Sequence, residues 1–205
     1  MKYKLDFSPK LNVSSPPVTG AIVGTAIQPA FVAWQPSTWP TAPAAVDDKF
    51  VFTLKRIFED SILGEIENVM SDVLQVNRDL QHRGHVIAIA LMCALTAISS
   101  YGYRGQHAAK FIRKHFRQEY HSHADEIYTL YRNSFVHGWN LFKASVYPDD
   151  SKIRLEGGAV AFGLLDFSQA LVQATEDFLE TLESDASLQR NTLKRYKELR
   201  GSAVP

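Results

Sequence analysis

The sequence predicts an all-α protein: an antiparallel helix bundle with a small β-hairpin before the last core helix and a proline-rich N-terminal extension. From Asp47 onward, apolar residues recur at spacings of three and four, which is the period of helices that bury one face. Breaks that contain glycine separate these stretches. Seven of the nine prolines lie between Pro9 and Pro43, where a long helix therefore cannot form.

The composition is that of a globular domain. Of the 205 residues, 45% are apolar and 21% are charged, and the formal net charge is zero. The chain as a whole therefore has no electrostatic attraction for nucleic acid, so any such contact must be local. Cys93 is the single cysteine, which excludes an internal disulfide, and its apolar neighbours predict that it is buried.

Shifts in composition divide the chain into three parts. Residues 1–45 are expected to form an extended Pro-rich arm, to which the sequence assigns no role. Residues 46–186 are expected to form the helical bundle. Residues 187–205 are expected to form a short, basic C-terminal helix and tail that pack only loosely on the rest.

The first two helices follow from apolar periodicity. One is expected to begin at Asp47 and to run for about seven turns, with Asp47 or Asp48 as its N-cap, because a carboxylate accepts from the free N–H groups of the first turn. The second is expected to begin at about Asp79 or Gly84 and to end near Ser100. It is apolar on nearly all sides, which predicts a place at the centre of the bundle.

Two further helices follow a turn at Gly102 and Gly105. The third is expected from about Gln106 to Tyr120 and the fourth from about Ala124 to Ala144. The third has one apolar side, formed by Ala109, Ile112, Phe116 and Tyr120.

The last part of the bundle contains the only predicted strands. Residues Ile153 to Phe162 are expected to form a hairpin that turns at Gly157 and Gly158, because glycine adopts positive φ without steric cost. An acid-faced helix from Phe167 to Leu182 and a basic helix from Leu188 to Leu199 complete the chain.

The fourth helix contains the most informative motif, Arg132-Asn133-Ser134-Phe135-Val136-His137. On a helix, Asn133 and His137 are i,i+4 neighbours, and Arg132 lies about 140° around the axis from His137. The motif therefore places a permanent cation, an amide and a titratable imidazole within about one and a half turns. A solvated Arg-Asn pair beside a core histidine is the structural alternative.

This motif, RNSFVH, resembles the signature of the HEPN superfamily (higher eukaryotes and prokaryotes nucleotide-binding): Arg, a polar residue, three variable residues and His. The order of helices and hairpin from about Asp47 to Asp185 is also similar to that of HEPN domains. The resemblance implies a metal-independent endoribonuclease, acting as a toxin or phage-defence effector with a separately encoded antitoxin. It also implies a homodimer in which two motif helices form a composite cleft.

The expected reaction is attack of a ribose 2′-hydroxyl on the adjacent phosphorus, which leaves a 2′,3′-cyclic phosphate. His137 is the group in the motif that takes or gives a proton near neutral pH. Arg132 positions the phosphate and stabilises its developing charge. Asn133 orients His137 or the phosphate by hydrogen bonds.

A second candidate site is a row of four cations on the third helix, called here the basic stripe: Lys110, Arg113, Lys114 and Arg117. With Tyr101, Tyr103 and His107 nearby, the stripe is a candidate track for an RNA backbone. A solvated helix face is the alternative reading of such a row, and the sequence leaves both open.

We expect no cofactor and no metal. His121 and His123 diverge on a helix, and His82 and His85 have no carboxylate or cysteine at ligand spacing. The apolar run from Val86 to Ile98 is too short to cross a bilayer, so a cytoplasmic location without membrane contact is expected.

Two other classes of function remain open from the sequence. One is a non-catalytic HEPN-like module that binds a nucleotide or a partner protein, since a fold does not certify a reaction. The other is a structural helical dimerisation module that uses the Pro-rich arm for interaction.

Overall fold

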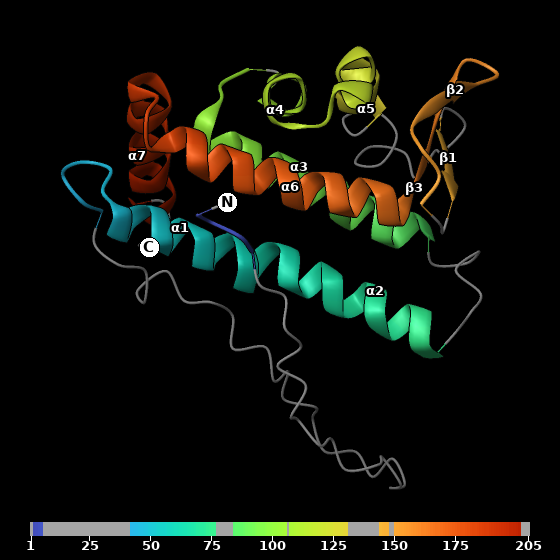
Figure 1. Ribbon diagram of the computed structural model, residues 1–205, viewed down its shortest axis with the longest axis horizontal. Coiled ribbons are helices and arrows are strands. Elements are labelled where there is room, and N and C mark those ends of the chain that lie inside the picture. Colours follow the sequence, from blue (N-terminus) through green and yellow to red (C-terminus); the bar gives the residue numbers. More distant parts are fainter. Residues whose placement is uncertain are drawn as a thin grey trace, which may run out of the picture.

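A computed structural model describes residues 2–5, 42–76, 84–105, 107–130, 144–147 and 150–201. These residues form a mostly helical protein with one small three-stranded sheet, as the sequence predicts in outline. The helices α3 and α6 lie between α1 and α2 on one side and α4 and α5 on the other, and α7 crosses one end while the sheet lies at the other (Figure 1).

The first predicted helix is present but is interrupted by a wider turn. It comprises α1 (Asp48–Phe58), a π-helical segment (Glu59–Leu63) and α2 (Gly64–Val76). The predicted cap is confirmed, since the Asp47 carboxylate accepts from the backbone N–H of Phe50 at 2.7 Å. In the π-helical segment the N–H of Gly64 donates to the carbonyl of Glu59, five residues back.

Gly64 is required by this wider turn, so Gly64→Ala is expected to lower the free energy of unfolding by about 1–3 kcal/mol. A Cβ atom on Gly64 would meet the backbone oxygen of Glu59 at a distance that Cβ atoms do not show, so the backbone must shift. Gly84→Ala is the matched control, because its Cβ would lie 3.7 Å from Leu164 Cδ1, an ordinary contact. Urea unfolding followed by circular dichroism measures both variants, and equal stability of the two would contradict this role of Gly64.

The apolar second helix is α3 (Gly84–Gly102), and it packs against α2, α4, α6 and α7. Its prediction as a central helix holds for one face, where Leu91, Leu95 and Ile98 are buried. The prediction that Cys93 is buried is wrong, because Cys93 is exposed on the face of α3 next to α2. Apolar composition on all sides does not reveal which side lacks a neighbour.

Within the described residues, no single helix has the length and apolar character needed to cross a membrane. Among the described residues, one pair of helical segments, Val86–Gly102 and His107–His115, passes that test by length and composition when taken together, and the two are bent by 86° to each other.

The third predicted helix is shorter than expected. It is observed as α4 (His107–His115), followed by a 3₁₀ helix (Gln118–His123). The predicted apolar side is confirmed across both, because its four residues are buried: Ala109, Ile112, Phe116 and Tyr120.

The fourth helix, α5 (Ala124–Leu130), starts where predicted and is described as far as Leu130. The prediction that it continues to Ala144 is wrong at that end, because Ala144 begins a strand.

The sheet has the order β1-β3-β2, formed by β1 (Ala144–Tyr147), β2 (Arg154–Glu156) and β3 (Ala159–Gly163). The hairpin prediction is confirmed: β2 and β3 pair antiparallel, and Gly157 and Gly158 have φ of 57° and 81°. Strand β1 was not predicted. It pairs in parallel with β3, from Ala144 opposite Val160 to Tyr147 opposite Gly163.

The chain ends with α6 (Leu164–Leu182) and α7 (Ala186–Gly201). The prediction that the C-terminal helix packs loosely is wrong, because Leu188, Thr192 and Tyr196 of α7 are buried and the helix contacts α3. The Tyr196 ring lies edge-on to Phe50 of α1, with 5.1 Å between the ring centroids.

The first residues of the predicted arm also belong to the fold. Tyr3 and Leu5 are buried in the core, and the backbone N–H of Leu5 donates to the buried Glu176 carboxylate of α6 at 2.7 Å. Most of the rest of the predicted arm, residues 6–41, lies outside the described residues.

Candidate functional site

The three predicted catalytic residues, Arg132, Asn133 and His137, lie outside the described residues. The structure describes both sides of the segment that contains them: α5 up to Leu130 and β1 from Ala144. Their catalytic roles therefore stay predictions.

All four cations of the basic stripe have a partner in the described residues, and three of them are paired with carboxylates. Arg113 pairs with Asp125 of α5, and Lys114 Nζ donates to Asp185 Oδ2 at 2.9 Å. Lys110 Nζ donates to the backbone carbonyl of Arg104 at 2.8 Å, and Arg117 pairs with Asp166 at 2.8 Å.

The contacts of Arg113 and Lys114 connect α4 to α5 and to the residue before α7. Arg117, just after α4, connects to Asp166 of α6. The side chains of Arg113 and Lys114 are each 43% exposed, so both still reach solvent. A phosphate backbone at the stripe would have to compete with carboxylates that are already in place. RNA binding by the four cations stays a prediction.

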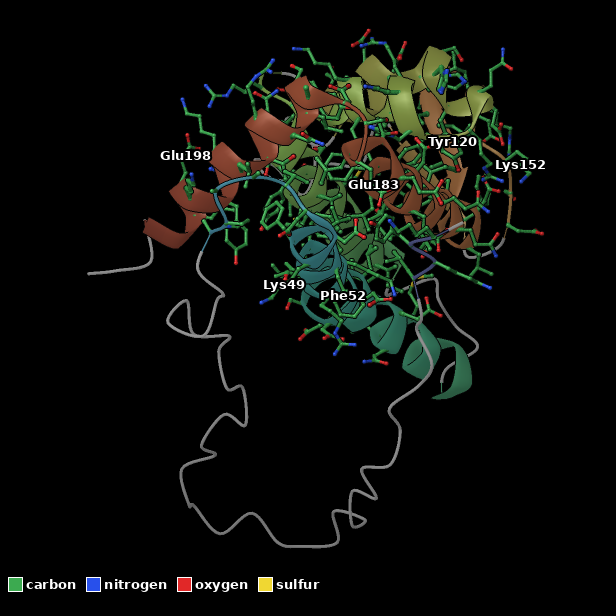
Figure 2. The ribbon with its side chains drawn as sticks, turned by 60° about the vertical axis from the view of Figure 1, so that its left-hand side comes forward. Lys49, Phe52, Tyr120, Lys152, Glu183 and Glu198 are labelled. Carbon is green, nitrogen blue, oxygen red and sulfur yellow. The ribbon has the colours of Figure 1, made fainter. Side chains whose placement is uncertain are left out.

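Asp166, in the first turn of α6, is the centre of a buried cluster. Its carboxylate is 1% exposed and accepts hydrogen bonds from Arg117, Tyr120 and Lys152. Burial alone would raise the pKa of Asp166, but these three hydrogen bonds outweigh it and hold the pKa below its usual value. Figure 2 shows Tyr120 and Lys152 on the same side of the molecule.

The Asp166 cluster joins α6 to the 3₁₀ helix and to the residues before β2. The buried Asp166 carboxylate is paired with two cations, Arg117 and Lys152. Arg117 also lies 3.4 Å from Glu119, and such pairing is typical of a structural network. The cluster gives no indication of a catalytic role.

A second chain of hydrogen bonds connects Tyr103, His115 and Asp177. The Tyr103 hydroxyl lies 2.6 Å from His115 Nε2, and His115 Nδ1 lies 2.5 Å from the Asp177 carboxylate. The buried His115 ring is most simply neutral, with Nδ1–H donating to Asp177 and Nε2 accepting from Tyr103. Burial lowers the pKa of His115, and it outweighs the opposing effect of Asp177.

The lowered pKa of His115 predicts a loss of stability in acid. Below about pH 6.5 an unfolded histidine binds a proton, whereas folded His115 resists one until its own lower pKa is reached. The free energy of unfolding should therefore decrease between pH 7.5 and 5.5, by at most about 1.4 kcal/mol per pH unit from this group. Urea unfolding at a series of pH values measures the slope.

His115→Gln is expected to reduce this slope, because glutamine does not titrate. His123→Gln is the matched control at a half-exposed histidine of the 3₁₀ helix. An unchanged slope in His115→Gln would show that other groups cause the pH dependence.

The described residues also form a polar pocket of about 350 Å³ where the end of α3, the turn before α4 and the face of α7 meet. Its lining is rich in groups that bind ligands: Ser100, Tyr101, Tyr103, Arg104, Gly105, His107, Asn191, Arg195 and Glu198. Within the described part of the chain, His107 Nε2 and Arg195 Nε are buried without a hydrogen-bond partner.

This polar pocket was not predicted from the sequence, although three of its lining residues were singled out for another role. Tyr101, Tyr103 and His107 were expected near the RNA track, and all three line the pocket. Arg104 and the α7 residues were not expected there. Glu198 lies on α7, on the opposite side of the view in Figure 2 from Tyr120 and Lys152, so the polar pocket is separate from the Asp166 cluster.

The described side chains do not bring three metal-ligating residues together: no group of three or more His, Cys, Asp or Glu is placed to hold an ion. No protein-family model, curated protein or solved structure matches this chain. What the structure defines is a mostly helical bundle with a small three-stranded sheet and a polar pocket at one end.

Proposed function

We propose that this protein is a metal-independent endoribonuclease of HEPN type. The observation that carries the proposal is the RNSFVH motif, residues 132–137, which follows directly on α5. The mostly helical fold, in which α5 contacts α4 and Ala124 and Ile127 of α5 are buried, is compatible with a motif placed on a bundle helix.

In the proposed reaction, a histidine takes the proton of the ribose 2′-hydroxyl while the 2′ oxygen attacks phosphorus. The bond from phosphorus to the 5′ oxygen breaks, which leaves a 2′,3′-cyclic phosphate and a 5′-hydroxyl. The departing oxygen needs a proton, and each chain has one motif histidine, His137. A homodimer supplies a second copy of His137 for this step, so we propose a composite cleft between two motif segments.

The biological setting belongs to the same proposal. A cytoplasmic ribonuclease that cleaves its host's RNA without restraint slows growth, and the proposed role is therefore that of a toxin or phage-defence effector with a separate antitoxin. Expression of the wild type should then reduce host growth, and His137→Ala should restore it.

The second candidate function is a non-catalytic HEPN-like module that binds a nucleotide or a partner protein. It is favoured by the pairing of the stripe cations Arg113, Lys114 and Arg117 with carboxylates, which leaves the stripe less suited to an RNA backbone.

The test is incubation of the purified protein with a mixed RNA pool in excess EDTA, followed by analysis of the product ends. Cleavage that leaves 2′,3′-cyclic phosphates, with DNA intact, would support the endoribonuclease. No cleavage by the wild-type dimer would favour the non-catalytic module. Sedimentation at micromolar concentration tests the dimer itself.

A further inference from the structure

The polar pocket contains buried donors without acceptors. Arg195 Nε and His107 Nε2 have no hydrogen-bond partner in the part of the chain that the structure describes. A buried polar atom without a partner costs free energy, commonly about 1–3 kcal/mol, unless a water molecule or a ligand satisfies it. Both atoms belong to residues that line the polar pocket, so the pocket is bordered by polar side chains whose hydrogen-bonding capacity is not fully used by the described residues.

The charges around this pocket favour an anion. Arg104 from the turn and Arg195 from α7 both face the single carboxylate of Glu198, at 3.6 Å and 3.7 Å. These separations are longer than hydrogen bonds, so neither guanidinium is tightly held by Glu198. Two fixed positive charges against one negative charge leave the lining with a net positive charge, even when His107 is neutral.

The shape of the pocket limits the size and form of this anion. A volume of about 350 Å³ is at the low end for small-molecule sites, which suits a ligand smaller than a dinucleotide. Donors approach from three elements, since Arg104 precedes α4, His107 begins it and Arg195 is on α7. Three donor side chains on one pocket match the three terminal oxygens of a tetrahedral oxyanion better than the two oxygens of a planar carboxylate.

The walls of the pocket are fixed by contacts outside it. The Tyr103 hydroxyl is held by His115, which is in turn held by Asp177. Asn191 Nδ2 donates to the backbone carbonyl of Gly102 at 3.2 Å, which ties α7 to the end of α3. Ligand binding to a site with fixed walls costs little conformational entropy of the protein.

We propose that the polar pocket binds a small phosphate monoester, with Arg104, Arg195 and His107 contacting the phosphate oxygens. The described lining of the pocket includes no residue of the RNSFVH motif, and the proposal does not depend on ribonuclease activity. The Ser100 and Tyr103 hydroxyls of the lining already hydrogen-bond to Ala97 and His115, and their remaining lone pairs can accept from the sugar or alcohol part of the ligand.

The test is isothermal titration calorimetry of the full chain with inorganic phosphate and with ribose 5-phosphate, in a chloride buffer of physiological ionic strength. Saturable binding of both, with acetate giving none, is the expected result. No saturable heat from either phosphate compound, or equal binding of acetate, would overturn the proposal.

Arg195→Gln is expected to weaken ribose 5-phosphate binding by about 10- to 100-fold, the loss typical of a hydrogen bond to a charged group. Arg190→Gln is the matched control, because Arg190 is an exposed arginine of α7 that does not line the pocket. Equal losses in the two variants would show non-specific charge attraction and overturn the site. If Arg195→Gln does not fold, Arg104→Gln, at an exposed residue, gives the same test.

A second readout locates the phosphate in the pocket. Burial, and next the charge of Arg195, lower the pKa of His107 in the free protein. A bound phosphate should raise that pKa, as seen in the His107 ring signals by NMR, whereas an unchanged His107 titration would place the phosphate elsewhere.

The phosphate monoester bound in the pocket can belong to a free sugar phosphate or to the 5′ end of an RNA. A short 2′-O-methyl RNA, which cannot undergo 2′-hydroxyl attack, is therefore titrated with and without a 5′-phosphate. Binding of ribose 5-phosphate without binding of the phosphorylated RNA assigns the site to a free metabolite. Tighter binding of the 5′-phosphorylated RNA than of ribose 5-phosphate, lost when the RNA has no 5′-phosphate, assigns it to an RNA end. Both results support a phosphate monoester site.

Discussion

His137→Ala is expected to reduce RNA cleavage in EDTA by about 10²- to 10⁴-fold, the usual contribution of a general acid or base. The physical reason is that no other side chain of the RNSFVH motif titrates near neutral pH, so water must replace the imidazole in proton transfer. The measurement is the initial cleavage rate on one defined RNA, with the product ends identified.

Arg132→Ala is expected to cost about 10²- to 10³-fold in the same assay, because the charge developing on phosphate loses a fixed donor. Arg132→Lys should recover only part of this loss, since an ammonium group cannot fork onto two phosphate oxygens. That graded series distinguishes an electrostatic role from a merely structural one.

The matched control for the histidine is His123→Ala, in the 3₁₀ helix before α5. It should cleave at the wild-type rate. If His137→Ala and Arg132→Ala keep full activity while folded, as judged by circular dichroism, the motif is not the active site. A rate lost equally in His123→Ala would indicate general damage to the fold instead.

Tyr196→Ala is expected to lower the free energy of unfolding by about 3–5 kcal/mol, the range for removing a large aromatic side chain from a core. Tyr196 is fully buried, and its ring packs edge-on against Phe50, so the change leaves a cavity between α1 and α7. Such a loss is a large part of the total stability of a domain. Urea unfolding measures it.

The control for Tyr196→Ala is Lys197→Ala, its exposed neighbour on α7, which should change stability by no more than about 0.5 kcal/mol. Similar, small effects of both substitutions would show that α7 is a loosely attached tail after all. A large effect of Tyr196→Ala alone would show that the C-terminal helix unfolds together with the bundle.

The elements that could be predicted from the sequence are those set by local interactions. Asp47 caps α1 because its carboxylate reaches an N–H only three residues away. Gly157 and Gly158 form the hairpin turn because both adopt positive φ. The period of Ala109, Ile112 and Phe116 gives the buried side of α4 correctly, although it does not show that the helix ends at His115.

The candidate sites were predicted less completely, because the residues that form them are far apart along the chain. Residue types and helical spacing predicted the four members of the basic stripe. They did not predict the carboxylates that pair with them, because Asp185, for example, lies 71 positions from its partner Lys114. The polar pocket needs Gly102 and Asn191 side by side, 89 positions apart. The motif residues Arg132, Asn133 and His137 rest on the sequence alone.

By itself, then, the sequence determined the helical class, the cap, the hairpin turn and the RNSFVH motif, because each depends on residues within a few positions of one another. Only the tertiary structure decided that Cys93 is exposed, that Tyr3 and Leu5 enter the core and that β1 joins β3. It also decided which cations are paired and which surround a pocket. Those outcomes depend on which elements pack together, and packing is set by the sum of many long-range contacts that no local pattern contains.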